Sequence, residues 1–196
     1  VALAQSDINN AVATLGTATS AQHIQKLFRF TDSIVFSFDG DSAGRKAAWR
    51  AMTNALPYIS DTRTMKFLFL PPEHDPDTFV REFGADKFNA EISTAMTLSQ
   101  FLLYGLKQAA PEANAEARAR QLHLAKPLLQ AMPHNALRTQ IIQSIAEQLR
   151  IQSNDVIDYA ELATNQRPAK RGIEKSKRSQ PLSAVEQALR LIPEHH

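Results

Sequence analysis

Short apolar runs alternate with helical patterns over roughly the first ninety residues of the chain. SIVFSF (33–38) and TMKFLFL (64–70) each predict a buried strand, because short apolar runs bounded by turn signals are typical of sheet interiors. Helical spacing precedes the first run, where Thr19 and Gln22 fit a capping box, and it also fills the stretch between the two runs. Strands separated by helices of this length predict βαβ units, and therefore an α/β fold with a parallel sheet flanked by helices.

From about residue 93 the pattern becomes helical throughout, with no strand candidate. Three segments have helical periodicity: FLLYGL (101–106), RARQLHLAKPLLQAM (118–132) and ALRTQIIQSIAEQL (136–149). Pro111, Pro127 and Pro133 are expected to break these helices, since proline removes a backbone donor. One more helix is expected to start within 153–158 and to end near Ala163. This part predicts a small all-α subdomain beside the α/β part.

The end of the chain has a different character. Residues 165–180 carry six Lys or Arg against one Glu and lack apolar periodicity, which predicts a flexible basic linker. A non-specific contact to phosphates is the alternative interpretation. Residues 181–192 are helical again but too short to fold alone. The expected organisation is therefore an α/β domain (1–92), a helical subdomain (93–164), a linker (165–180) and a truncated further domain (181–196).

The amino-acid composition limits the classes of protein to which this chain can belong. The chain is 43% apolar and 21% charged, as globular proteins are, which excludes wholesale disorder. It has no cysteine, so a disulfide, a Cys-ligated zinc and a thiol nucleophile are all excluded, and a cytoplasmic location is expected. No membrane span is expected either. Because the chain begins at Val1 without a signal-peptide pattern, we expect it to start inside a longer protein.

Two acidic pairs are the strongest candidates for chemistry. Asp39 and Asp41 follow the first predicted strand, and Asp75 and Asp77 follow the second. Ligands bind at the carboxyl ends of strands in open parallel sheets, so both pairs are expected at one edge. Four carboxylates there suit a hard divalent ion such as Mg²⁺. A purely structural interpretation stays open, because Asp-Gly is a common turn and Asp-Pro a common helix start.

Other candidates are weaker. His74 adjoins the second pair and is expected to be solvated, and Trp49 is expected in the core. Arg45 and Lys46 open a predicted helix, where cations are unfavourable, so they suggest either an anionic partner such as a phosphate or simply solvated charges. The three tyrosines lack a neighbouring base and are expected to pack rather than to act as nucleophiles: Tyr58, Tyr104 and Tyr159.

The sequence around the acidic pairs resembles a known family. The resemblance is to the TOPRIM core of bacterial DNA primases and covers roughly residues 1–160. It is carried by FSFDGDSAGRKAAWRA (36–51) and FLFLPPEHDPDTFVREFG (67–84), with support from ATLGTATSAQHIQKLFR (13–29) and TAMTLSQFLLYGL (94–106). Motif, spacing and flanking residues agree over dozens of positions, which is far more specific than two acidic pairs alone.

The resemblance implies a concrete function. The parent protein would make short RNA primers on single-stranded DNA from ribonucleoside triphosphates. Its Mg²⁺ or Mn²⁺ ligands would be Asp39, Asp41, Asp75 and Asp77. The family also has a glutamate on its first strand, which here would end at Val1–Leu3, so that glutamate would precede the first residue. A zinc-binding N-terminal domain would be missing too, and 181–196 would begin a domain that binds the replicative helicase.

We therefore expect a monomeric bacterial protein that acts in the cytoplasm at the replication fork, without a membrane. The piece alone is expected to be inactive, since the family glutamate and neighbouring domains are absent from it. Two alternatives remain open from the sequence. One is a TOPRIM nuclease or topoisomerase-like enzyme, and the other is a non-catalytic fragment that binds nucleic acid or a protein partner.

Overall fold

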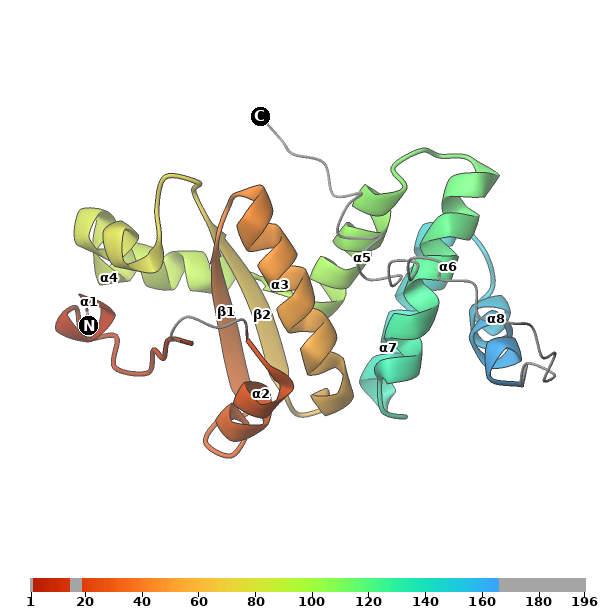
Figure 1. The fold of residues 1–196 in the computed structure, drawn as a ribbon, viewed down its shortest axis with the longest axis horizontal. Helices are drawn as coiled ribbons and strands as arrows, with labels where there is room; N and C mark the ends of the chain where they lie inside the picture. The colour runs from red at the N-terminus through yellow and green to blue at the C-terminus, as the bar shows by residue number, and fades with distance from the viewer. Residues whose placement is uncertain (1, 15–18, 166–196) are drawn as a thin grey trace, which may run out of the picture.

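A small sheet lies at the centre of the structure, a computed structural model that describes residues 2–14 and 19–165 (Figure 1). Strands β1 (Ser33–Asp39) and β2 (Thr64–Leu70) run parallel and pair along their whole length. The two-residue strand β3 (Met96–Thr97) pairs with the other side of β2 in the antiparallel sense. The two long strands coincide with the two apolar runs, and the predicted α/β fold with a parallel strand pair flanked by helices is confirmed.

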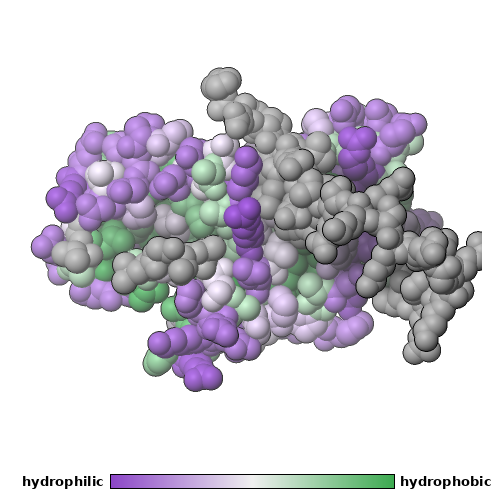
Figure 2. All heavy atoms as spheres, in the orientation of Figure 1, coloured by the Kyte–Doolittle hydropathy of each residue, from purple (hydrophilic) through white to green (hydrophobic). Residues whose placement is uncertain are grey.

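One face of the sheet is covered by the helix that connects the two parallel strands. Helix α3 (Ser42–Ala55) and the short 3-10 helix η1 (Leu56–Tyr58) lead from β1 to β2. Trp49, which is almost fully buried, packs from α3 onto this face, as the sequence predicts. The outer side of α3 carries polar residues, and a hydrophilic stripe runs over this helix in Figure 2.

The opposite face is covered by α4 (Pro76–Thr94) together with the one-turn helix α1 (Ala2–Gln5) (Figure 1). Alternation along β2 explains the two faces, since Leu68 and Leu70 face α4 while Phe67 faces α3. A smaller hydrophobic cluster joins these leucines to residues of α4. In Figure 2, hydrophobic residues are visible between α1 and β1.

The second half of the described chain is helical, as the sequence predicts. It consists of α5 (Leu98–Ala109), α6 (Ala115–Ala131), α7 (Ala136–Leu149) and α8 (Ser153–Asn165). Helix α5 packs on β2 and also on α6 and α7, so it joins the sheet to the other helices (Figure 1). A single buried cluster runs from β1 and β2 through α5 into α6, α7 and α8.

Three local expectations are wrong. Helix α2 (Ala21–Leu27) is capped by Ser20 and not by Thr19, because the Ser20 hydroxyl accepts from the His23 amide at 3.3 Å while the His23 ring accepts from Ser20 N. A strand ending at Val1–Leu3 is also wrong. Residues 2–5 form a helical turn there, and the Leu3 carbonyl at this turn accepts from the amides of Ser6 and Ile8.

The third wrong expectation concerns Pro127, which lies inside α6 instead of breaking it. Proline costs about 3 kcal/mol in a helix interior. Here Leu124, Leu128 and Leu129 are buried on both sides of it, and burial of one such side chain offsets about 1.5–3 kcal/mol. Pro111 and Pro133 do lie between helices, as expected.

The short strand β3 is a further departure, since no strand was expected after residue 93. Its two residues pair with Lys66 and Phe67 of β2. A strand of two residues is too short to show the alternation by which a sequence pattern predicts a strand. Residues 166–196, which hold nearly all of the predicted linker and the whole of the 181–196 segment, lie outside the described residues. Among the described helices none is long and apolar enough to span a membrane.

Candidate functional site

The two acidic loops lie side by side at the carboxyl edge of β1 and β2. Asp39 is the last residue of β1 and is paired with Leu70, the last residue of β2. Gly40 then packs so closely against this end of β2 that a Cβ atom would collide with the Leu70 carbonyl and would touch Pro72 Cδ at 3.5 Å. Only glycine fits there, so the first acidic loop rests directly on the chain that leads to Asp75.

Asp39 and Asp41 have different local roles. Asp39 is exposed, and neither of its carboxylate oxygens accepts a hydrogen bond from the described chain. Asp41 is the N-cap of α3, and its Oδ1 accepts from the Gly44 amide at 2.6 Å. A side chain at Gly44 would collide with the Asp39 carbonyl, so glycine is required here too. The turn thus presents Asp39 to solvent while it folds Asp41 onto its own helix.

A shallow cavity of about 340 Å³ lies beside this turn. Its lining combines the two carboxylates with small side chains: Ser37, Phe38, Asp39, Asp41, Ala43, Gly44 and Ala47. The Ser37 hydroxyl is buried and has no hydrogen-bond partner within the described residues. Sequence reasoning missed Ser37, although strand alternation places it on the same face of β1 as Asp39.

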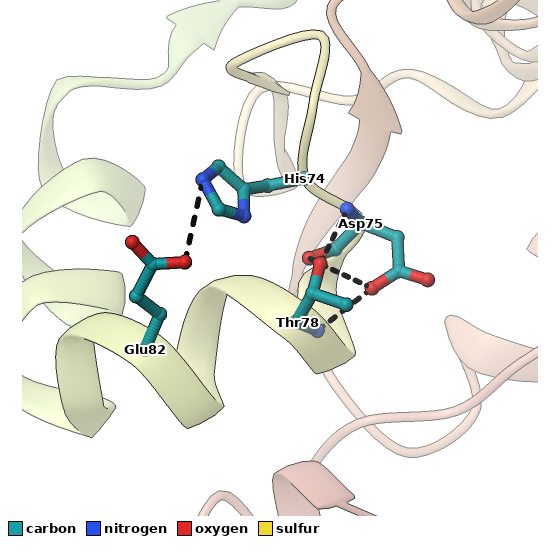
Figure 3. A network of polar contacts seen from close by, with 4 residues as sticks. All are labelled: His74, Asp75, Thr78 and Glu82. Atoms are coloured by element: carbon teal, nitrogen blue, oxygen red, sulfur yellow. Dashed lines mark hydrogen bonds and ion pairs between the residues drawn. The ribbon is translucent and has the colours of Figure 1, made fainter.

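Asp75 begins α4 and is held by Thr78 (Figure 3). Its Oδ1 accepts from the Thr78 amide at 2.8 Å and from the Thr78 hydroxyl at 2.9 Å. These hydrogen bonds to the ionised carboxylate lower the pKa of Asp75 below its ordinary value of 3.8. Pro76 occupies the first helical position, so the structural interpretation of this Asp-Pro pair is confirmed. The second oxygen, Oδ2, remains available.

Asp77 lies in the first turn of α4 and forms an ion pair with Arg81 at 2.9 Å. Both side chains are about half exposed, at 46% and 66%, so the pair is weak and exchangeable with other partners. Arg81 therefore competes for Asp77 with any ligand at this edge.

His74 is packed instead of solvated, contrary to the expectation from sequence. Its side chain is only 12% exposed and its ring meets Phe79 and Phe83 edge-on, with centroids 5.9 and 5.2 Å apart. Its Nε2 lies 3.8 Å from a Glu82 carboxylate oxygen (Figure 3). His74 thus fixes the loop before Asp75 against α4, a role that depends on aromatic residues one and two turns later in the helix.

The structure brings the two acidic loops together without gathering their carboxylates into one cluster. Among residues 2–14 and 19–165, no group of three or more acidic or histidine side chains is arranged to hold a metal ion. The reason is visible in the contacts, since Asp41 and Asp75 turn back as helix caps and Asp77 pairs with Arg81. The donors are nonetheless all carboxylate oxygens, the ligand type that Mg²⁺ and Mn²⁺ prefer.

Comparison with known proteins connects this edge to a family. A sequence model described as Toprim-like matches residues 1–80, which contain both acidic pairs. A second one, described as the DnaB-helicase binding domain of primase, matches residues 99–154. This second match covers α5–α7 and the first residues of α8, all within the predicted helical subdomain (93–164).

Curated relatives are bacterial DNA primases. The chain is 48% identical over 151 residues to DNA primase from Escherichia coli strain K12, covering 77% of this chain and 26% of that protein. It is 49% identical over 148 residues to DNA primase from Pseudomonas aeruginosa, covering 75% of this chain and 22% of that protein. The chain therefore spans about a quarter of the length of these relatives.

Solved structures agree. A DNA primase domain from Pseudomonas aeruginosa superposes with a TM-score of 0.77 at 46% identity, over 82% of this chain and 50% of that one. A DnaG catalytic core superposes with a TM-score of 0.75 at 45% identity, over 79% of this chain and 50% of that one. Together these matches support a DnaG-type bacterial DNA primase fragment, which comprises a Toprim-like region and the helices that follow it.

Proposed function

We propose that this chain forms the metal-binding part of an active site that synthesises short RNA primers on single-stranded DNA. The observation that carries the proposal is the contact between the two acidic loops at one sheet edge, through Gly40 and the end of β2. The similarity to DNA primases supports it, since the matched region contains both loops. In this reaction a 3′-hydroxyl attacks the α-phosphorus of a ribonucleoside triphosphate, and pyrophosphate leaves.

Mg²⁺ or Mn²⁺ would be held by Asp39, Asp41, Asp75 and Asp77. A bound divalent ion offsets the negative charge of the triphosphate and of the reacting phosphorus. Asp39 presents both oxygens to solvent, while Asp41 and Asp75 each keep one oxygen free of their capping hydrogen bonds. The Thr78 hydrogen bonds lower the pKa of Asp75 below 3.8, so its carboxylate is ionised at neutral pH and also in mild acid. The caps hold two of the four ligands on rigid helix starts, which restricts their positions.

The proposed partners follow from the relatives. One solved relative is a DnaG catalytic domain bound to single-stranded DNA, which supports a single-stranded template here. The match to a helicase-binding domain supports a contact with the replicative helicase, and it falls on residues 99–154, outside the 181–196 segment to which the sequence resemblance assigned that contact. We propose a monomer at the replication fork in the bacterial cytoplasm. This piece is expected to be inactive alone, because the matched part is only 26% of the length of one relative and 22% of the other.

The metal site is tested by replacing Asp39 and Asp41 with asparagine. We expect affinity for Mn²⁺ to fall by roughly tenfold or more, because two charged oxygen ligands are lost. Isothermal titration calorimetry with Mn²⁺ measures this, and circular dichroism checks the fold. The fold should persist, since asparagine caps helices about as well as aspartate and Asp41→Asn retains the cap.

Asp86→Asn is the matched control, because Asp86 is an exposed acid on α4 beyond the non-helical Gly84. It should leave the Mn²⁺ affinity unchanged. Equal Mn²⁺ affinity in the wild type and the double variant would overturn the site assignment.

A further inference from the structure

Arg45 is held by aromatic rings on the α5 side of the same sheet edge. It lies in the first turn of α3, where its amide donates to the Asp41 carbonyl at 3.0 Å. Its guanidinium carbon lies 5.1 Å from the centre of the Phe69 ring on β2 and 6.0 Å from that of Tyr104 on α5. Both distances are within the range of cation–π contacts, so the guanidinium lies against two aromatic rings.

No group of the described chain uses those donors. Within residues 2–14 and 19–165 the Arg45 side chain has neither a carboxylate in ion-pair range nor a hydrogen bond. The charge is also poorly placed for helix stability, because the N-terminal end of a helix disfavours a cation. An arginine that lies against two rings, has no partner among the described residues and sits at an unfavourable helix position is suited to an anion from outside the chain.

The Arg45 guanidinium lies close to the sheet edge that carries the acidic loops. Phe69 pairs with Phe38, one step before the terminal pair of Asp39 with Leu70. Phe38 and Phe69 both lie on the α3 and α5 face of the sheet, with ring centroids 6.4 Å apart. Arg45 therefore lies beside the carboxyl ends of the two strands, although it does not line the cavity next to Asp41.

We propose that Arg45, supported by Phe69 and Tyr104, is a phosphate-binding subsite beside the acidic loops. The planar fork of a guanidinium donates two parallel N–H bonds to phosphate oxygens, which an ammonium cannot do. The proposal deepens the proposed function and rests on it, since a triphosphate bound at the acidic edge is one source of that phosphate. The backbone of a nucleic acid strand is the other source, with the same chemistry.

The test uses Arg45→Ala together with Arg45→Met, which keeps apolar packing on Phe69 without the charge. Binding to the chain is measured by calorimetry for ATP, with and without Mn²⁺, and for a dT oligonucleotide. We expect both variants to weaken binding of one probe by about tenfold, the scale of a lost charge-assisted pair. Affinity for Mn²⁺ alone should not change. Arg50→Ala is the control, because Arg50 is an exposed cation on the same helix.

Each outcome has one meaning. Loss of ATP binding alone assigns the subsite to the triphosphate, and loss of oligonucleotide binding alone assigns it to a nucleic acid backbone. Unchanged affinity for both probes, or equal losses in Arg50→Ala, would overturn the subsite while leaving the metal site intact. If the wild type binds no Mn²⁺, the proposed function fails, and the titrations without metal still decide whether Arg45 binds phosphate. A wild type that binds neither probe would overturn the subsite.

Discussion

Asp75 combines a structural role with its proposed role as a metal ligand. Its carboxylate caps α4 through Thr78, and the same hydrogen bonds lower its pKa below 3.8. A group whose pKa is lower in the folded state stabilises that state at pH values above its unfolded pKa. The contribution is lost as pH falls through the folded pKa, which here lies below 3.8.

We expect Asp75→Ala to lower the free energy of unfolding by about 1 kcal/mol at neutral pH, as for other helix caps. Asp75→Asn should lose much less, because its amide oxygen still accepts from Thr78. Urea unfolding at about pH 7 and about pH 3 measures both variants. The deficit of Asp75→Ala should shrink at the lower pH, and a deficit that is independent of pH would contradict a role for the ionised carboxylate.

Single residues show what a sequence can and cannot reveal about this site. The Asp75-Pro76 cap follows from residue types alone, because its partners are three positions away. The packing of His74 and the stacking of Arg45 depend on rings brought close by α4, β2 and α5, so no local pattern reports them. The sequence also predicted that the acidic pairs share an edge. It missed the Asp41 cap and the Asp77–Arg81 ion pair, which help to keep the carboxylates apart.

At the scale of elements, the sequence predicted well the strands and helices that have a long apolar pattern. It did not predict features that depend on a few tertiary contacts. Strands β1 and β2 and helix α7 have almost the predicted bounds, because each buries several side chains on a regular period. Strand β3 consists of two residues, and α6 continues through Pro127, so both are decided by packing against neighbours.

The contact between α3 and α5 predicts that a glycine-to-alanine change in α5 lowers the stability of the protein. Gly105 of α5 faces Trp49, and a Cβ atom there would overlap several ring carbons of the indole. Gly→Ala in a helix interior ordinarily stabilises by about 1 kcal/mol. Here we expect Gly105→Ala to destabilise by about 1–3 kcal/mol, the cost of overpacking a filled core. Urea unfolding followed by tryptophan fluorescence measures it.

Two further variants test whether a clash with Trp49 is the reason for the expected loss of stability in Gly105→Ala. Lys107→Ala, at an exposed position of the same helix, should change stability by no more than about 0.5 kcal/mol. In a Trp49→Phe background, followed by circular dichroism, the cost of Gly105→Ala should fall, because the smaller ring leaves room for the methyl group. A Gly105→Ala variant that is more stable than the wild type would show that the two helices can move apart at little cost.

At the scale of the whole molecule, the α/β part and the helical part share one core. Phe101 on α5 stacks on Phe67 at 4.8 Å between centroids and meets Trp49 edge-on at 6.0 Å. The same buried cluster continues into α6, α7 and α8. The sequence suggested a boundary near residue 92 because the pattern changes from mixed to helical there. A change of pattern does not reveal whether the two parts bury surface against each other, which only the packed structure does.

We therefore expect the two parts to unfold together in one transition, since neither could leave the shared core without exposing Phe101 and its partners. Phe101→Ala should lower the free energy of unfolding by about 3–5 kcal/mol, whereas Phe30→Ala, at a residue that is 82% exposed, should cost little. Urea unfolding is followed by tryptophan fluorescence, which reports on Trp49 in the α/β part, and by far-ultraviolet circular dichroism, which reports on all the helices. The two midpoints should coincide in the wild type and shift by the same amount in Phe101→Ala. Separate midpoints would mean that the helices of the second half fold as an independent unit and that α5 only docks them onto the sheet.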